Sequence, residues 1–368
     1  MTVDPPVVLA PMAGVTNAAF RQLCYEQGAG LAVCEMLTAQ GMVMGNDHSA
    51  DMLTFWPGER IRSAQLYGSD PDALWVAVGI AVQEFGVNHV DLNFGCPVPK
   101  VTRHGGGGAL PWKLGLTRAL IESAVRSADR FGVPVTVKTR IGLDDAHETF
   151  LDVGRIAGDA GVAAICLHAR TVAQAYAGAA DWTAIARLVE AVDIPVIGNG
   201  DIWEGADAVR MMQETGCVGV EVGRGALGRP WLFADIAAAL VEPVETSAPH
   251  LPNLGEVCAL LRRHARLLAD LMGEVHACKD IRKHTAWYLK GFPVGGETRA
   301  ALASVTSLNQ LDELLEHLDP SVPFPVEELG RPRGRQGNPR GHVILPKGWL
   351  DDRDGLGLTI DDADATGG

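Results

Sequence analysis

The sequence predicts a (β/α)8 barrel followed by a small helical bundle. Short segments rich in Val, Ile and Leu recur eight times within about 240 residues, and segments with apolar residues at helical spacing lie between them. Strand–helix alternation repeated eight times is typical of this barrel. A doubly wound open sheet is the alternative, but its first turn carries G-x-G-x-x-G, and no such motif follows the first expected strand.

Each expected strand is a short run dominated by apolar residues. In chain order the strands span residues 7–10, 31–35, 63–67, 89–93, 135–139, 164–168, 195–198 and 219–222. The barrel helices are expected at residues 70–85, 113–130, 152–160, 181–191 and 204–215, where apolar residues recur at helical spacing. The fourth strand has the clearest end, because Pro97, Pro99 and the glycines at 105–108 exclude regular structure after it.

Four parts are expected along the chain: a barrel domain, a linker, a helical bundle and a C-terminal extension, at residues 1–241, 242–254, 255–320 and 321–368. Three prolines interrupt the linker: Pro243, Pro249 and Pro252. The bundle has helical patterns over residues 257–272 and 308–318. The chain is expected to act as a monomer.

The extension is expected to be either flexible or wrapped over the surface. Its charged residues are cations among Gly and Pro and then a run of aspartates: Arg331, Arg333, Arg335, Arg340, Asp351, Asp352, Asp361, Asp362 and Asp364. The sequence leaves two alternatives open for the extension: it adds contacts to phosphate groups, or it opposes such contacts.

The composition is that of a soluble globular protein, with 47% hydrophobic and 21% charged residues. No apolar run approaches the ~20 residues that span a bilayer, and the N-terminus lacks a secretion signal, so a cytoplasmic location without membrane contact is expected. Seven cysteines, an odd number with no C-x-x-C pair, argue against a disulfide framework and against a zinc or iron–sulfur site. No metal is expected.

The net charge of −14 opposes binding to nucleic acid, because phosphates are bound by clustered Lys and Arg. Between residues 262 and 290, however, seven cations stand against three anions, a local excess of four positive charges. Taken alone, such a run is typical of a solvated helix face.

Asn93-Phe94-Gly95-Cys96-Pro97 places one thiol where the fourth strand ends and a glycine-rich loop begins. A cysteine at such a junction is positioned to meet a ligand, whereas most unpaired cysteines are small buried hydrophobes. We interpret Cys96, which is flanked by Asn93 and Lys100, as a residue that takes part in the chemistry of the site.

In a barrel, the carboxyl ends of the strands surround one pocket. The residues at these ends are Pro11, Met12, Ala13, Glu35, Gln65, Asn93, Cys96, Lys138, Arg140, His168, Arg170, Asn199, Asp201, Gly223 and Arg224. Burial of Lys138 without an anionic partner is costly, which favours a phosphate or flavin partner. Three of the residues have alternative roles. His168 is either functional or part of the core, and Gln65 is either functional or a strand cap. Asn93 either contacts the substrate or only orients the loop.

Two glycine-containing loops follow the last two strands, at residues 198–202 (GNGDI) and 223–228 (GRGALG). Loops at these two positions form the usual phosphate site of the barrel, where glycine lets the phosphate approach and an arginine such as Arg224 pairs with it. Together they predict a phosphorylated ligand such as FMN.

The sequence resembles the tRNA-dihydrouridine synthases, and within them the bacterial B-type branch, over residues 7–317. The motifs that carry the resemblance are 10–16 (APMAGVT), 91–97 (DLNFGCP) with Lys100, 137–140 (VKTR), 167–171 (LHART), 198–202, 223–224, and in the bundle 282–284 (RKH), 287–288 (WY) and 290–291 (KG).

The resemblance implies reduction of uridines in tRNA to 5,6-dihydrouridine. FMN would be held by Pro11, Met12, Ala13, Gln65, Lys138, His168, Asn199, Gly200, Asp201, Gly223 and Arg224. NADPH, or alternatively NADH, would reduce FMN, and hydride would pass to C6 of the uracil. Cys96 would then protonate C5 as general acid, since an ordinary thiol with a pKa near ~8.5 is protonated at neutral pH. Contacts to the uridine or to tRNA phosphates are implied for Asn93, Lys100, Arg140, Arg170, Arg282, Lys283 and Lys290.

Two other functions remain open. An FMN barrel dehydrogenase acting on a free small molecule shares the flavin site but needs no basic bundle. A non-enzymatic tRNA-binding protein needs the bundle but neither Cys96 nor the glycine loops. Within the bundle, Trp287 and Tyr288 are either a tRNA surface or part of the core.

Overall fold

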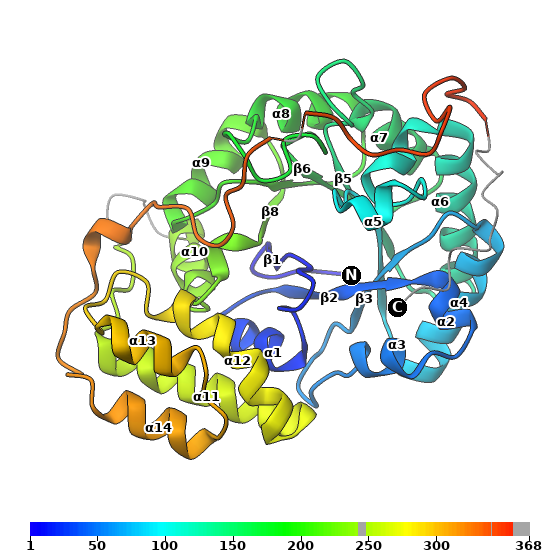
Figure 1. Ribbon diagram of the computed structural model, residues 1–368. Helices are drawn as coiled ribbons and strands as arrows, with labels where there is room; N and C mark the ends of the chain where they lie inside the picture. The colour runs from blue at the N-terminus through cyan, green and yellow to red at the C-terminus, as the bar shows by residue number, and fades with distance from the viewer. Residues whose placement is uncertain (242–247, 340, 356–368) are drawn as a thin grey trace.

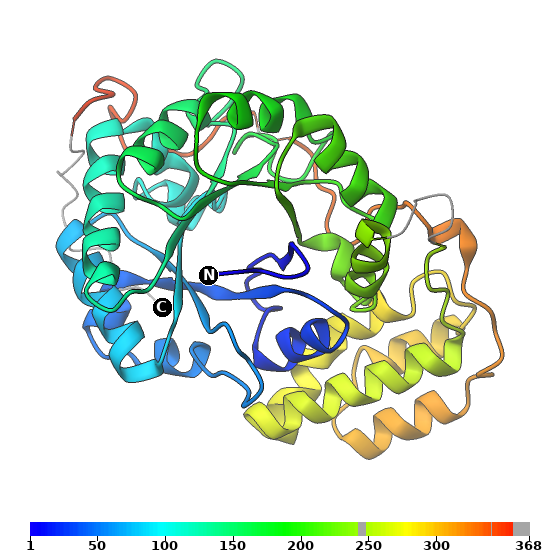
Figure 2. The ribbon, with the colours of Figure 1, turned by 180° about the vertical axis from the view of Figure 1, so that it is seen from behind.

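The structure, a computed structural model, describes residues 1–241, 248–339 and 341–355. Eight parallel strands form a closed barrel in which each strand pairs with the next and β8 pairs with β1. Figures 1 and 2 show the helices around the outside of this barrel, so the predicted fold class is confirmed. The strands are β1 (Val7–Leu9), β2 (Leu31–Thr38), β3 (Ser63–Tyr67), β4 (His89–Phe94), β5 (Val135–Arg140), β6 (Ala164–His168), β7 (Val196–Asn199) and β8 (Gly219–Val222).

The five helices predicted in the barrel are present, each within two residues of its expected bounds. The helices of this region are α1 (Ala18–Glu26), α2 (Ala39–Val43), α3 (Asp47–Met52), α4 (Pro71–Phe85), α5 (Pro99–Thr102), α6 (Leu114–Asp129), α7 (Phe150–Asp159), α8 (Trp182–Ala191), α9 (Gly205–Thr215) and α10 (Leu232–Val241). Short 3-10 turns are η1 (Gly107–Trp112) and η2 (Arg224–Ala226). The expectation that Pro97, Pro99 and the glycines at 105–108 exclude regular structure after the fourth strand is wrong. The helix α5 begins at Pro99, because the first turn of a helix tolerates proline, and η1 begins at Gly107.

Local capping explains where the barrel helices begin. In α4, Asp70 accepts a hydrogen bond from the backbone N–H of Asp72, Pro71 occupies the first turn, and Gly86 ends the helix in the left-handed region at φ +66°. The sequence reasoning left α1 unassigned, although the side chain of Asn17 caps it by accepting from the backbone N–H of Phe20.

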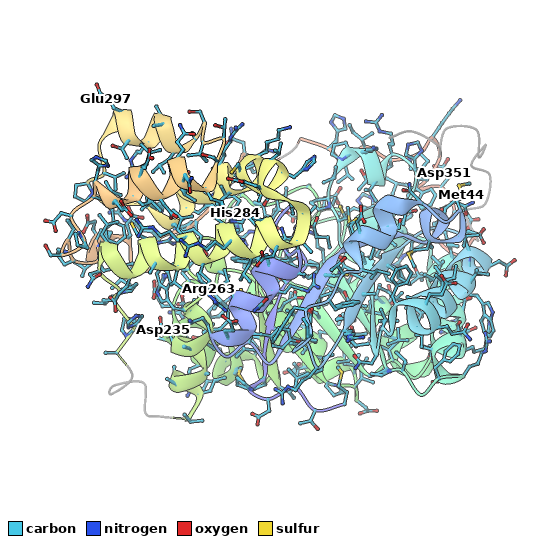
Figure 3. The ribbon with its side chains drawn as sticks, turned by 90° about the horizontal axis from the view of Figure 1, so that it is seen from below. Met44, Asp235, Arg263, His284, Glu297 and Asp351 are labelled. Atoms are coloured by element: carbon cyan, nitrogen blue, oxygen red, sulfur yellow. The ribbon has the colours of Figure 1, made fainter. Side chains whose placement is uncertain are left out.

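The second part of the chain is a bundle of α11 (Leu254–Met272), α12 (Glu274–Tyr288), α13 (Gly296–Leu302) and α14 (Leu308–Glu316). Its apolar core also includes Ala19 and Trp231 of the barrel, so the two parts share a packed interface. In Figure 3, Arg263 of α11 lies beside α1, and its Nε donates to Glu26 at 3.1 Å. His284 of α12 is fully buried at the same interface, where its ring lies 5.9 Å from that of Phe20.

The described part of the C-terminal extension lies across the barrel, on the side of the molecule that faces the viewer in Figure 1. It includes η3 (Val326–Glu328), and further along Trp349 is buried and donates from Nε1 to the carbonyl of Ala109 at 3.0 Å. Its described residues therefore have the surface-wrapping arrangement. The expectations for Arg340, for Asp361, Asp362 and Asp364, and for the linker residues 242–247 with Pro243 fall outside the described residues.

Within the ranges that the structure describes, the helices lack the combination of length and apolar character that a membrane span requires.

Candidate functional site

A cavity of about 360 Å³ opens at the carboxyl ends of the strands. Fifteen of the residues predicted for the site line it: Pro11, Met12, Ala13, Gln65, Asn93, Cys96, Lys138, Arg140, His168, Arg170, Asn199, Gly200, Asp201, Gly223 and Arg224. Five candidates lie outside its lining: Glu35, Lys100, Arg282, Lys283 and Lys290. The topology of the barrel thus brings together residues spread over more than two hundred positions of the chain.

Lys138 on β5 has an anionic partner within the protein. Its Nζ lies 2.8 Å from the carboxylate of Glu221 on β8 and donates to Oδ1 of Asn199 on β7 at 3.0 Å. Burial lowers the pKa of Lys138, but its acidic neighbours Cys166 and Glu221 more than offset this, so the pKa lies above its ordinary value. The argument that Lys138 needs a ligand as its anion is therefore wrong. Glu221 was missed, although a lone carboxylate in the apolar strand Gly219–Val222 is a signal of such a pair.

A chain of hydrogen bonds runs from the barrel interior to the backbone of Cys96. Gln65 donates to Asp91 at 2.7 Å, and its amide oxygen accepts from Asn93 at 2.9 Å. The oxygen of Asn93 then accepts from the backbone N–H groups of Gly95 and Cys96, at 3.1 and 2.9 Å. Asn93 thus orients the cysteine loop, and Gln65 is more than a strand cap.

Asp91 is buried and lies at the start of this series of hydrogen bonds. The sequence pattern did not predict it as a site residue. Thr136 also donates to it, at 2.6 Å. Burial raises the pKa of Asp91 to about 7, even though both hydrogen bonds act in the opposite direction. The i, i+2 spacing of Asp91 and Asn93 on one strand was the available signal, because such residues share a face. Below them, Ser63 and His89 are joined at 2.7 Å, and burial lowers the pKa of His89 to about 4.

Cys96 differs from the other six cysteines, which are all buried, because it is half-buried in the wall of the cavity. Its carbonyl accepts from the backbone N–H of Gly108 at 2.9 Å. A Cβ at Gly107, where φ is +54°, would lie 2.9 Å from the Cβ of Cys96. The glycine-rich loop therefore packs directly on the cysteine and fixes its backbone.

Two arginines, Arg140 at the end of β5 and Arg170 after β6, donate to backbone carbonyls, and those of Arg170 belong to Ala177 and Gly178. Arg140 donates to the carbonyls of Gly95, Thr171 and Ala175, and burial lowers its pKa to about 10. Arg170 binds Asp201 through Nη2 at 2.7 Å. The Nη1 of Arg170 is buried and has no hydrogen-bond partner among the residues that the structure describes. It is a donor that suits an acceptor on a ligand.

Arg224 lies after β8 between two aromatic rings that were not predicted. Its guanidinium lies 5.0 Å from the ring centre of Tyr176 and 5.3 Å from that of Trp203. Its Nη1 donates to the carbonyl of Arg335 in the C-terminal extension at 2.9 Å, and Nη2 lies 3.7 Å from Asp201. Tyr176 and Arg335 belong to segments without regular structure, where the strand-end rule makes no prediction.

The cavity carries an excess of positive charge in a chain whose net charge is −14. Its lining has five cations and two carboxylates: Lys138, Arg140, Arg170, Arg224, Arg335, Asp201 and Glu221. Burial, reinforced by the nearby cations, holds the pKa of His168 well below its ordinary value, so its imidazole is neutral. This excess of positive charge favours an anionic ligand in the cavity.

The bundle residues predicted to contact tRNA have partners within the protein. Arg282 donates to the carbonyl of Val305 at 2.8 and 3.0 Å. Lys283 pairs with Asp280, and Lys290 lies 2.7 Å from Glu328. The remaining candidate, Lys100, is exposed on α5.

The two aromatic residues of the bundle have different surroundings. Tyr288 is buried in the core of the bundle. Trp287 lines the cavity and packs against the core of the barrel. The aromatic pair therefore does not form a single surface.

Comparisons with known proteins agree on one family. The family described as "Dihydrouridine synthase (Dus)" matches residues 8–322. A protein of Mycobacterium tuberculosis named "Probable tRNA-dihydrouridine synthase" is 54% identical over 357 residues, covering 95% of this chain and 90% of its own length. A protein of Vibrio vulnificus named "tRNA-dihydrouridine synthase B" is 35% identical over 314 residues, covering 85% of this chain and 95% of its own length.

Proposed function

The chain belongs to the dihydrouridine synthase family, and we propose that it reduces uridines of tRNA to 5,6-dihydrouridine with FMN as cofactor and NADPH as reductant. The observation that carries this proposal is that Cys96 and Asn93 share one cavity with the glycine-containing loops after β7 and β8 and with five cations. In this proposal, a proton donor for carbon and a site for a phosphorylated ligand share that cavity.

The residues present fit FMN. The cavity has a volume of about 360 Å³, within the range of small-molecule sites. Its excess of positive charge suits a ligand that carries an anion. The Nη1 of Arg170, which has no hydrogen-bond partner in the described part of the chain, suits a carbonyl acceptor on that ligand. Arg224 and Gly223 would hold the phosphate, while Lys138 and Gln65 would lie along the flavin ring. When bound, FMN supplies the hydride for C6 of the uracil, with electrons that come from NADPH.

The chain's own residues would complete the reaction at the uracil. Cys96 would donate its proton to C5, and solvent would return a proton to the sulfur. Asn93 would keep the cysteine backbone in place through the hydrogen bonds described above. The neutral imidazole of His168 would donate one hydrogen bond to the base or flavin without adding a further positive charge.

Extraction of a uridine from folded tRNA costs a few kcal/mol of unstacking, so a second RNA-binding surface is useful. We propose residues 255–320 for this surface, with Lys283 near Gly14 in the loop after β1 and with Lys100 of α5 as a further contact from the barrel. We propose that the protein acts on tRNA as a monomer. A tRNA substrate would place the enzyme in the cytoplasm.

The test uses purified flavin-loaded protein, NADPH or NADH, and tRNA from a strain that lacks dihydrouridine. Formation of dihydrouridine in tRNA but not in free uridine supports the proposal. Turnover of free pyrimidines at the same rate as tRNA would instead identify a small-molecule dehydrogenase. Binding of tRNA without any reduction would leave only an RNA-binding role.

A further inference from the structure

We propose that Arg335, in the C-terminal extension, binds a phosphate group at the rim of the cavity. The match to the family ends at residue 322, before Arg335, so this contact is an addition to the family's common part. The proposal rests on the proposed function, because the phosphate belongs either to the flavin nucleotide or to the tRNA next to the target uridine.

Residues 328–335, here called the strap, are fixed against the barrel and the bundle. Glu328 pairs with Lys290 at 2.7 Å, and the backbone N–H of Gly330 donates to Glu204 of the barrel at 2.8 Å. Arg333 is only 3% exposed and donates to the carbonyl of Trp287 at 2.9 Å. The path of the strap up to Arg335 is therefore set by contacts on both parts of the chain.

The strap approaches the loop after β8 at Gly334. This residue has φ +67°, and a Cβ there would lie 2.7 Å from Cδ1 of Leu227. Glycine therefore permits both the backbone conformation and the close approach. The next residue is Arg335, whose carbonyl accepts from Arg224 at 2.9 Å. Arg335 thus lies beside the arginine that we place at the flavin phosphate.

The charges around Arg335 favour an anion. Arg335 is exposed and lines the cavity, and its guanidinium has no ion pair among the described residues. By contrast, Arg331 of the same strap lies 3.8 Å from Glu328 and outside the cavity. Arg335 is the fifth cation of a lining that has two carboxylates. A phosphate group would offset this excess and accept two hydrogen bonds from a planar guanidinium.

The test compares Arg335→Ala and Arg335→Lys with the matched control Arg331→Ala, all as full-length protein. Affinities for FMN and for riboflavin are measured by flavin fluorescence, and tRNA affinity is measured over a range of salt concentrations. Riboflavin has the same ring system without the phosphate. Melting temperature and circular dichroism show whether each variant is folded.

Two results support the proposal and separate the two phosphates. If Arg335 binds the flavin phosphate, Arg335→Ala weakens FMN binding about tenfold and leaves riboflavin binding unchanged. If it binds RNA, FMN affinity stays at the parent value, while tRNA binding weakens and its salt dependence becomes shallower. In either case Arg335→Lys retains part of the affinity.

The proposal is overturned if Arg335→Ala binds both FMN and tRNA like the parent, or if Arg331→Ala has an equal effect. Failure of the proposed function is a separate result. It would appear in the parent protein itself, as absence of dihydrouridine formation in tRNA, whatever the Arg335 variants do.

Discussion

Lys138 and Glu221 form an ion pair of 2.8 Å that joins β5 to β8 inside the barrel. Both side chains are largely buried, with 14% and 4% of their surface exposed. Removal of one partner of a buried pair leaves an uncompensated charge, which costs more than removal of both. The pair therefore ties two strands of the site together, and it keeps the ammonium group of Lys138 charged, as a residue that would contact the flavin.

Lys138→Met should destabilise the protein by about 3–5 kcal/mol, because Glu221 then remains buried without a cation. The double variant Lys138→Met/Glu221→Gln should be more stable than this single variant. Urea unfolding of the parent and both variants, each with and without added FMN, separates the loss of the ion pair from any loss of cofactor. If the single variant is as stable as the double variant, the buried carboxylate of Glu221 does not need the cation of Lys138 to compensate its charge.

Arg224→Ala should weaken FMN binding by about tenfold or more, because a charge-assisted phosphate contact contributes about 1.5 to 3 kcal/mol. Fluorescence titration of the apoprotein with FMN measures this effect. Arg210→Ala is the matched control, since Arg210 also stacks on an aromatic ring, that of Trp182 at 4.9 Å, but lies outside the cavity. If Arg224→Ala retains the parent affinity, Arg224 is not at the phosphate.

The barrel was predictable because its buried parallel strands are continuous apolar runs, and seven of the eight lie within one residue of the expected bounds. β2 was expected to end at residue 35 but continues to Thr38, past the charge of Glu35. The strand-end rule then located most of the site, because parallel strands of a barrel all point their carboxyl ends to one side.

The rest of the site depends on contacts between distant segments. Arg335 reaches the cavity 111 residues after Arg224, along a path that no local pattern encodes. The charge count over residues 262–290 likewise omits contacts to distant segments of the chain. Four of its cations pair with Glu26, Asp312 and Glu328, all outside the counted window: Arg262, Arg263, Arg266 and Lys290. A local charge excess therefore overstates the positive charge that the bundle presents to RNA.

The pH dependence of stability should reveal Asp91. Its pKa of about 7 in the folded protein lies above the value near ~3.9 of an unfolded chain. The folded state therefore binds the proton more tightly. The stabilising contribution of Asp91 is complete below about pH 4 and is lost as the pH rises through about 7.

Asp91→Asn removes this titration and keeps an acceptor oxygen for Gln65. The difference in free energy of unfolding, variant minus parent, should increase by a few kcal/mol from pH 4 to pH 8. Urea unfolding at a series of pH values measures the difference, in which the contribution of His89 cancels because both proteins contain it. A difference that stays constant over this range would mean that Asp91 is ionised throughout.

Lys283→Ala should weaken tRNA binding and reduce the slope of log affinity against log salt by about 0.7 to 0.9, the value for one phosphate contact. Lys283 suits this role because its Nζ would lie 3.9 Å from a Cβ at Gly14, in the loop after β1. Arg118→Ala, on the remote helix α6, is the control. An unchanged slope in Lys283→Ala, with FMN content as in the parent, would assign Lys283 only to its pair with Asp280.

Cys96→Ala should separate proton donation from the rest of the reaction. The variant should retain FMN and its reduction by NADPH, because the cavity keeps its cations and its glycine loops. Dihydrouridine formation should fall by roughly 10²- to 10⁴-fold, the usual contribution of a positioned general acid. Single-turnover assays on tRNA, alongside stopped-flow reduction of the flavin, measure the two steps independently.

Cys278→Ala removes a buried cysteine of the bundle outside the cavity and should affect neither step. If Cys96→Ala forms dihydrouridine at the parent rate, the proton must come from another group at the cavity, and the half-buried thiol would serve only to pack against Gly107.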